Sequence, residues 1–147
     1  LEQWQPGKEL FENAICKTRQ ALAACDNELA GILWHQGEAD SKYKKNAETY
    51  DGRFKQTINC LRKEFNNPRL PVIAGELGRF LADNPDYPYF TTVNIALANN
   101  ANALVSSEEL SDSDRKDNTH FDTESLRKFG SRYAEAYLQL INQGLSQ

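Results

Sequence analysis

Three short apolar runs, separated by longer stretches with a helical period, constrain the fold of this chain more than any other feature of its sequence. The runs are Gly31-Ile32-Leu33-Trp34, Leu70-Pro71-Val72-Ile73-Ala74-Gly75 and Ala103-Leu104-Val105. Each run is too short for a helix and is apolar on successive residues, which is typical of a strand buried on both faces. Such strands occur in parallel sheets covered by helices, so the sequence predicts an α/β fold.

Four stretches around these runs repeat apolar residues at intervals of three and four, as amphipathic helices do. They cover residues 10–25, 43–65, 90–97 and 126–140. Asp40 or Ser41 is the expected N-cap of the second stretch, and Asp122 or Thr123 that of the last. The order α-β-α-β-α-β-α predicts a three-layer α/β/α sandwich with a parallel sheet, formed by residues 1–147 as a single domain.

The predicted sheet has only three strands, and the first predicted element is a helix with no strand before it. A βαβ arrangement calls for at least one more strand on the N-terminal side. The chain also begins at Leu1 and contains no Met among its 147 residues. We therefore expect it to be the later part of a domain whose N-terminal strands are missing.

Composition and charge argue against several classes of partner. Apolar residues make up 39% and charged residues 26% of the chain, which is ordinary for a folded globular protein. The net charge is −4, and acids follow the densest basic stretch, Lys42-Tyr43-Lys44-Lys45, as on a solvated helix face. No apolar run approaches the roughly 20 residues of a membrane span. We expect neither nucleic acid nor a membrane as a partner.

Cys16, Cys25 and Cys60 form no C-x-x-C pair. If Cys16 and Cys25 share a helix, nine steps of about 1.5 Å separate them too far for a disulfide. We expect all three to be small buried or half-buried thiols. The compartment is unknown from the sequence; the free cysteines and the lack of a signal peptide in this segment give a slight preference for the cytoplasm.

Polar residues follow each predicted strand, at the edge where open parallel α/β sheets bind ligands. The three segments are His35-Gln36-Gly37-Glu38-Ala39-Asp40, then Glu76-Leu77-Gly78-Arg79, and finally a polar loop that ends in Asp117-Asn118-Thr119-His120. Both histidines of the chain are therefore expected on the same rim.

Asp117 precedes His120 by three residues, so its carboxylate can orient the imidazole as a general base requires. An exposed loop histidine beside a turn-forming aspartate fits the same spacing.

In the earlier loop, Gln36 can donate to a developing oxyanion, and Glu38 can orient an imidazole or a sugar hydroxyl. Gly37 permits a sharp turn or a close approach of the backbone to a substrate. A capped strand-to-helix turn with a core histidine at His35 is the alternative interpretation.

Taken together, the two loops carry a family resemblance. Trp34-His35-Gln36-Gly37-Glu38-Ala39-Asp40 resembles the W-H-Q-G-E-[SA]-D block of the sialate O-acetylesterase / acetyl xylan esterase group of the SGNH-hydrolase superfamily. Asp117-Asn118-Thr119-His120-Phe121 resembles the late D-x-x-H-[FL] block of that group, and residues 1–7 are similar to the segment after its second block. The resemblance implies a flavodoxin-like fold and a serine esterase that removes acetyl groups from sugars such as sialic acid or xylan, without a metal or an organic cofactor.

The same resemblance implies roles for the site residues. His120 would be the general base and acid, oriented by Asp117, with Glu38 as an additional or alternative orienting carboxylate. Gln36 would contribute to the oxyanion hole, and Gly37 and His35 would lie beside the substrate.

The nucleophile block of the family, a G-Q-S-N-like turn, would lie upstream of Leu1. The implied partners are therefore an acetylated carbohydrate and the N-terminal part of the same domain, which would supply the serine. Ser106 and Ser107 lack the flanking glycines of a nucleophile turn. We expect this chain alone to be inactive.

Two further hypotheses stay open. The chain could be a non-catalytic module of esterase ancestry that binds acetylated glycans or an upstream partner chain. Alternatively, both histidines with Glu38 and Asp117 could bind a metal, although their spacing is not H-E-x-x-H and no cysteine joins them.

Overall fold

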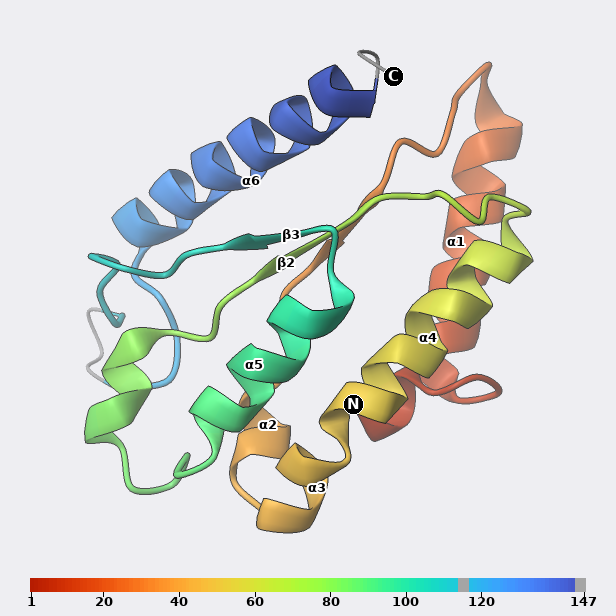
Figure 1. Ribbon diagram of the computed structural model, residues 1–147. Coiled ribbons are helices and arrows are strands. Elements are labelled where there is room, and N and C mark those ends of the chain that lie inside the picture. Colours follow the sequence, from red (N-terminus) through yellow and green to blue (C-terminus); the bar gives the residue numbers. More distant parts are fainter. Residues whose placement is uncertain (114–116, 145–147) are drawn as a thin grey trace.

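The computed structural model describes residues 1–113 and 117–144 and arranges them around a parallel sheet (Figure 1). The strands, in the order β1-β2-β3, are β1 (Ile32–Trp34), β2 (Val72–Gly75) and β3 (Ala103–Val105). Leu33 pairs with Ile73, and Ile73 pairs with Ala103. The predicted α/β fold with a parallel sheet is confirmed, and each strand lies inside its predicted apolar run.

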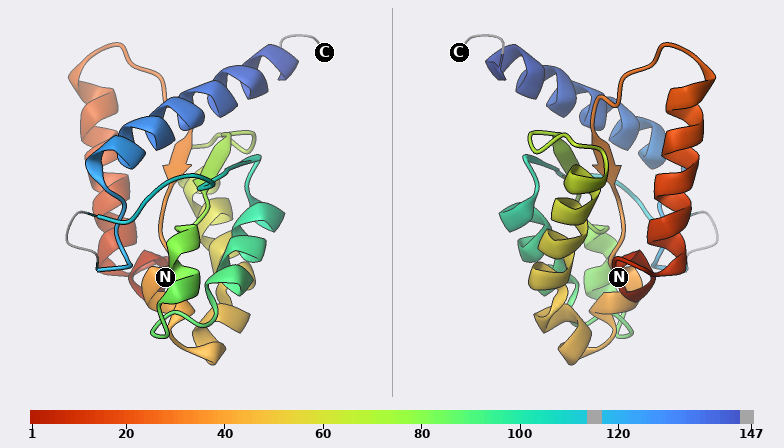
Figure 2. Two further views of the ribbon diagram at one scale, coloured as in Figure 1. Left: turned by 90° about the vertical axis from the view of Figure 1, so that its left-hand side faces the viewer. Right: turned by 90° about the vertical axis from the view of Figure 1, so that its right-hand side faces the viewer.

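Helices cover both faces of the sheet. Those among the described residues are α1 (Glu9–Ala24), α2 (Glu38–Ser41), α3 (Lys44–Glu48), α4 (Tyr50–Glu64), α5 (Phe90–Asn100) and α6 (Thr123–Gly144), with short 3-10 helices at Glu2–Trp4 and Arg79–Asp83. Helix α6 lies on one face, whereas α4 and α5 lie on the other (Figures 1 and 2). Over the described part of the chain, no helix combines the length and apolar character that a membrane crossing requires.

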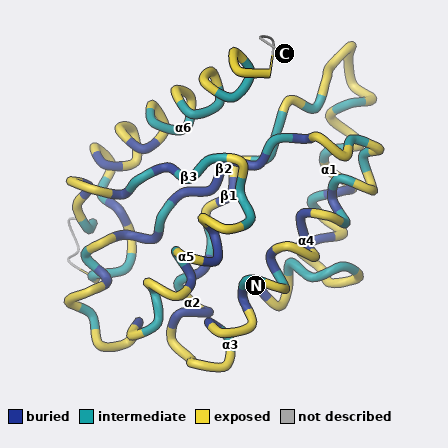
Figure 3. Tube along the Cα trace, viewed as in Figure 1, coloured by how far each residue is buried: buried dark blue, intermediate teal, exposed yellow. Residues whose placement is uncertain are grey.

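Alternate residues of β2 enter two different cores, because successive side chains of a strand point to opposite faces. Val72 and Ala74 pack with Trp34 in the core that includes α4 and α5. Ile73 packs with Phe129 in the core beneath α6. All four residues of β2 are buried (Figure 3), as the unbroken apolar run predicts.

The helix predicted over residues 43–65 is divided into α3 and α4, and this part of the prediction is wrong. The division falls at Thr49, whose hydroxyl donates to the carbonyl oxygen of Lys45 at 2.8 Å. A threonine that bonds back to the preceding turn competes with the helical backbone. Asp122 caps α6 as expected, since its Oδ1 accepts the N–H of Ser125 at 2.6 Å.

The expectation of buried thiols is wrong for Cys16 and Cys25, which are exposed, whereas Cys60 is half-buried. Helix α1 buries Phe11 and Ile15, and much of its remaining surface faces solvent. Cys16 lies on this solvated part, and Cys25 directly follows the helix as its C-cap.

Gly75 allows α6 to pack against the end of β2, which yields a stability test. A Cβ atom there would collide with the hydroxyl of Tyr133 and lie 2.6 Å from Cζ of Phe129. We expect Gly75→Ala to lower the free energy of unfolding by about 1–3 kcal/mol, because α6 must shift. Urea unfolding followed by circular dichroism measures this change.

Gly52→Ala in α4 is the matched control, because apart from its chain neighbours and the nearby backbone of its own helix no atom lies within 4 Å of its added Cβ. Alanine suits a helix interior better than glycine, so this control should raise stability by up to about 1 kcal/mol. A Gly75→Ala variant as stable as the unmodified chain would contradict the close packing of α6.

Candidate active site

The two loops predicted to carry chemistry meet at one rim of the sheet. His35 follows β1 and packs edge-on against Phe121 and Phe129, with ring centroids 5.6 and 5.4 Å away. Phe121 directly follows His120 in the chain. The aromatic contact therefore brings the loop after β1 beside the loop that enters α6.

Asp117 and His120 form a hydrogen-bonded pair. Oδ2 of Asp117 lies 2.8 Å from Nδ1 of His120, and Oδ1 accepts the backbone N–H groups of Thr119 and His120 at 2.9 and 3.0 Å. The hydrogen bond from the imidazole is the largest influence and holds the pKa of Asp117 well below its ordinary range. An ionised carboxylate only accepts, so it directs the proton to Nδ1 and leaves Nε2 as the basic nitrogen.

The His120 side chain is 76% exposed, so solvent or a substrate can reach it. The geometry is that of an oriented general base. The backbone N–H groups that Asp117 accepts also complete a turn, so the pair serves the local structure as well.

Contacts from the segment before α5 hold this loop in place. Asn118 has a left-handed backbone with φ of 48°, and its carbonyl oxygen accepts from Nδ2 of Asn84 at 3.0 Å. The Thr119 hydroxyl donates to the hydroxyl of Tyr87 at 3.1 Å. Asn84 and Tyr87 were not predictable as partners of this loop, because nothing in the local sequence marks a contact across more than thirty residues.

Glu38, the other candidate orienting carboxylate, contacts His35. Its Oε1 lies 3.3 Å from Nε2 of His35, and its Oε2 accepts the backbone N–H of Gly37 at 3.1 Å. Burial is the largest single influence and raises the pKa of Glu38, but the hydrogen bond and charge of His35, together with backbone N–H groups, bring that pKa below its ordinary value. Of the two carboxylates, Asp117 is the one that bonds to His120.

Gly37 is required by the backbone and by packing. Its φ of 151° lies in a region that favours glycine, and a Cβ there would lie 2.6 Å from Cγ1 of Val93. Its N–H bonds to Glu38. The backbone conformation and the packing explain why residue 37 is glycine, with no need for a role in substrate binding. The binding roles of Gly37 and His35 stay predictions.

Asp40 and Tyr50 anchor Gln36 through its side-chain amide and its backbone carbonyl oxygen, which accepts from the Tyr50 hydroxyl at 2.7 Å. Nε2 donates to Oδ2 of Asp40 at 2.8 Å, and the hydroxyl of Tyr50 lies 3.1 Å from Oε1. Arg53 in turn donates to Oδ1 of Asp40 at 3.0 Å. An amide nitrogen carries two N–H groups, so one remains to serve an oxyanion. No catalytic or binding role was expected for Asp40, Tyr50 or Arg53, although Asp40 closes the motif that begins at Trp34. The expectation that Asp40 or Ser41 caps the next helix is wrong, because both lie inside α2.

The serines after β3 make structural contacts. Ser106 Oγ lies 3.3 Å from both Glu76 Oε2 and Arg79 Nη2, and the buried Ser107 donates to the carbonyl oxygen of Leu77 at 3.0 Å. Neither contact involves a histidine. Over residues 1–113 and 117–144, no group of three or more His, Cys, Asp or Glu side chains is arranged to hold a metal ion.

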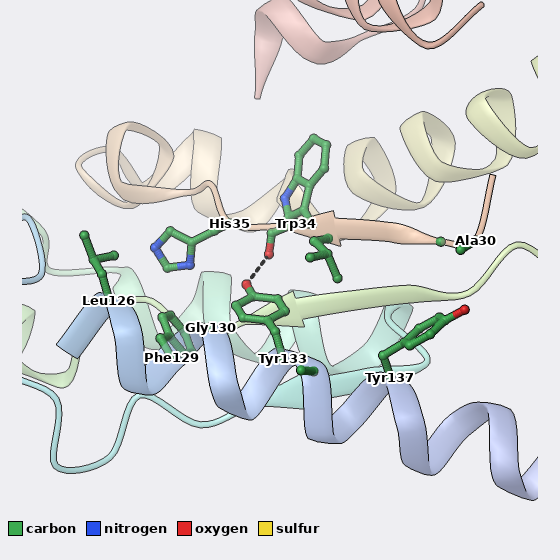
Figure 4. Close-up of a pocket in the computed structure, with 11 residues that line it drawn as sticks. Ala30, Trp34, His35, Leu126, Phe129, Gly130, Tyr133 and Tyr137 are labelled. Carbon is green, nitrogen blue, oxygen red and sulfur yellow. Dashed lines mark hydrogen bonds between the residues drawn. The ribbon is translucent and has the colours of Figure 1, made fainter. Parts of the chain in front are cut away.

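An apolar groove of about 570 Å³ lies between β1 and α6 (Figure 4). Its lining includes Leu33 and His35 from one side and Phe129, Tyr133 and Tyr137 from α6. The Tyr133 hydroxyl donates to the carbonyl oxygen of Trp34 at 2.8 Å, as Figure 4 shows. Leu33 is 65% exposed although it belongs to a strand. The groove therefore follows the edge of β1 and includes His35 of the rim.

Comparisons with known proteins place the chain in a family and support its fold. The family described as "Carbohydrate esterase, sialic acid-specific acetylesterase" matches residues 1–139. A probable carbohydrate esterase of Arabidopsis thaliana is 29% identical over 141 residues, which cover 94% of this chain and 51% of that protein.

Two crystal structures share the fold. One, of a protein from Arabidopsis thaliana, superposes with a TM-score of 0.83 at 28% identity and covers 94% of this chain and 56% of that one. The other, of NanS, has a TM-score of 0.76 at 17% identity, with 95% and 55% covered, and supports the fold alone. The chain spans about half the length of the relatives it matches.

The bond between Asp117 and His120 can be tested by titration. Because the imidazole favours the ionised carboxylate, acidification should protonate Asp117 only well below the ordinary range, and the contribution of this bond to folding should disappear as the pH falls through that lowered pKa. His120→Ala should raise the midpoint of Asp117, measured by carboxyl ¹³C NMR.

Asp122 is the internal control in the same spectra. Its pKa is lowered chiefly by the backbone N–H of Ser125, so it should keep its midpoint in the His120→Ala variant. An unchanged midpoint for Asp117 would show that the pair does not form in solution.

Proposed function

Because this chain belongs to the family of carbohydrate esterases described as sialic acid-specific acetylesterases, we propose that it is part of a carbohydrate O-acetylesterase. The proposed substrates are acetyl esters on sugars such as sialic acid or xylan. The observation that carries the proposal is the 2.8 Å bond from His120 Nδ1 to Asp117, which leaves Nε2 of an exposed imidazole as a base on the rim of the sheet.

The proposed reaction is an acetyl transfer through a serine that lies outside the described residues. The serine oxygen bonds to the acetyl carbonyl carbon while Nε2 of His120 takes the hydroxyl proton, and Asp117 stabilises the imidazolium. The remaining N–H of Gln36 stabilises the oxyanion. When the ester C–O bond breaks, His120 returns the proton to the sugar oxygen. Water, activated by the same histidine, then releases acetate from the serine.

We propose that the serine belongs to a segment that precedes this chain in a longer polypeptide. Three observations support a strand of that segment along the groove. β1 stands at the edge of the order β1-β2-β3, Leu33 is exposed there, and the groove lining is apolar. Because parallel strands end on the same rim, a strand parallel to β1 would end near His35 and the loop of His120. An unpaired strand edge readily accepts such a partner.

From the proposed catalytic roles we expect substitutions in the longer polypeptide to lower kcat by different amounts. We expect His120→Ala to lower kcat for acetyl ester hydrolysis by about a thousand-fold or more, and Asp117→Asn by at least about a hundred-fold. Glu38→Gln should cost less than about ten-fold, since Glu38 contacts His35 and not His120. Release of acetate from O-acetylated sialic acid and from acetylated xylan measures these rates and identifies the sugar.

Lys128→Ala is the control for this series, because Lys128 forms an exposed pair with Glu124 on α6 and should leave kcat unchanged. Full activity after His120→Ala would refute the proposed mechanism. Glycan binding by a longer polypeptide that shows no hydrolysis would favour a binding module instead.

With a strand in the groove, we expect Leu33→Asp to change the free energy of unfolding differently in the 147-residue chain and in the longer polypeptide. In the 147-residue chain, Leu33 is largely exposed, and we expect a change in the free energy of unfolding within about 0.5 kcal/mol. In the longer polypeptide an added strand would bury this position, and a buried charge should cost at least about 2 kcal/mol. Denaturant unfolding of both proteins measures the difference.

Leu138→Asp serves as the comparison, since Leu138 is 52% exposed on α6 and is not part of the groove lining. It should have a small and equal effect in both proteins. A similarly small effect of Leu33→Asp in the longer polypeptide would show that the groove stays open.

A further inference from the structure

A buried polar cluster lies behind Gln36. Asp40 is 3% exposed; its Oδ1 accepts from Nη2 of Arg53 at 3.0 Å, and its Oδ2 accepts from Nε2 of Gln36 at 2.8 Å. The amino group of Leu1 also donates to Oδ2, since the start of the chain lies beside α2 (Figure 2). In a longer polypeptide that nitrogen is a peptide N–H, which still donates one hydrogen bond.

Stability alone is a poor explanation for this cluster. Asp40 loses almost all of its contact with water, and Arg53, whose side chain is 23% exposed, loses much of it. This loss of hydration is costly, and apolar side chains of similar volume often stabilise a core as well. Nε of Arg53 is buried and has no hydrogen-bond partner among the described residues, which adds to the cost. A cluster of this kind is better explained by the orientation that it imposes on a neighbour.

The chemistry of the partners fixes which end of the Gln36 amide faces which group. Asp40 only accepts, so it selects the amide nitrogen. Trp34 Nε1 only donates, and it occupies the Tyr50 oxygen at 3.2 Å, so the Tyr50 proton is directed to the carbonyl oxygen of Gln36 at 2.7 Å or its Oε1 at 3.1 Å. Burial, the largest influence, raises the pKa of Tyr50 and keeps that proton in place.

We propose that Asp40, Arg53 and Tyr50 are positioning residues, which lock the Gln36 amide so that its second N–H has one fixed direction toward the oxyanion of the acetyl transfer. This inference rests on the proposed function. A donor that is already oriented stabilises developing charge without reorganising during the reaction. Arg53 acts through Asp40 and also donates to the carbonyl oxygen of Asn46 at 2.8 Å, which ties the carboxylate to α3.

The lock can be observed in the 147-residue chain without any activity. In ¹⁵N–¹H spectra, the two side-chain amide protons of Gln36 should have well-separated shifts and exchange more slowly with water than those of the exposed Gln3. Asp40→Asn and Tyr50→Phe should each bring the two proton shifts of Gln36 closer together and speed their exchange toward that of Gln3. An amide of Gln36 that exchanges as fast as that of Gln3 would overturn the proposal.

The catalytic consequence is tested in the longer polypeptide by a double-mutant cycle. We expect Gln36→Ala to lower kcat by about a hundred-fold or more with little change in KM, and Asp40→Asn or Tyr50→Phe to lower it by about ten-fold. Because Asp40 acts through Gln36, the double variant should be no slower than Gln36→Ala alone.

Asp51→Asn is the matched acid-to-amide control in α4, since Asp51 accepts from Asn100 at 2.8 Å and should leave kcat unchanged. If the decreases in kcat of Gln36→Ala and Asp40→Asn multiply in the double variant, the positioning role is overturned while the esterase function stands. A longer polypeptide without esterase activity would overturn the proposed function and with it the catalytic use of the lock, whereas the amide spectra would still show whether the lock exists.

Discussion

Parallel pairing of β1 with β2 is the constraint on which the site depends. Side-by-side strands that run in one direction deliver the segments after them to one rim. The pairing of Trp34 with Ala74 places His35 at that rim, and Gly75 leaves room for α6 to bring Phe129 against it. The Asp117–His120 loop precedes α6, so the same packing brings this loop beside the loop after β1, where His35 contacts Phe121. The geometry of the candidate site therefore follows from the sheet and one helix.

In the proposed mechanism, the described residues supply the proton-transfer and oxyanion parts of the site, and the serine comes from outside them. The base, its carboxylate and the amide donor are each held by contacts within the described residues, such as Tyr87 for the His120 loop and Asp40 for Gln36. The candidate site borders the edge of β1 and the apolar groove, whose lining includes His35. The proposed division of the site between two parts of one polypeptide accounts for a groove beside β1, the edge strand among the described residues.

Features that depend on neighbouring residues were predictable from the sequence, and those that depend on distant contacts were not. Apolar runs placed the strands, and the three-residue spacing of Asp117 and His120 anticipated their bond. The partner of Glu38 was not predictable, because the turn at Gly37 decides whether it faces His35 or His120. The division of the helix at Thr49 reflects a hydroxyl that competes for a carbonyl oxygen, which apolar periodicity does not register.

The most direct test is the crystal structure of the longer polypeptide after reaction with a serine-directed phosphonate, whose tetrahedral phosphorus imitates the acetyl-transfer intermediate. We expect an adduct on a serine that follows a strand paired with β1. A phosphonate oxygen should lie within about 3.2 Å of Gln36 Nε2, with His120 Nε2 at a similar distance from the serine oxygen. An adduct on a serine remote from His120, or a strand order that leaves the groove empty, would contradict this expectation.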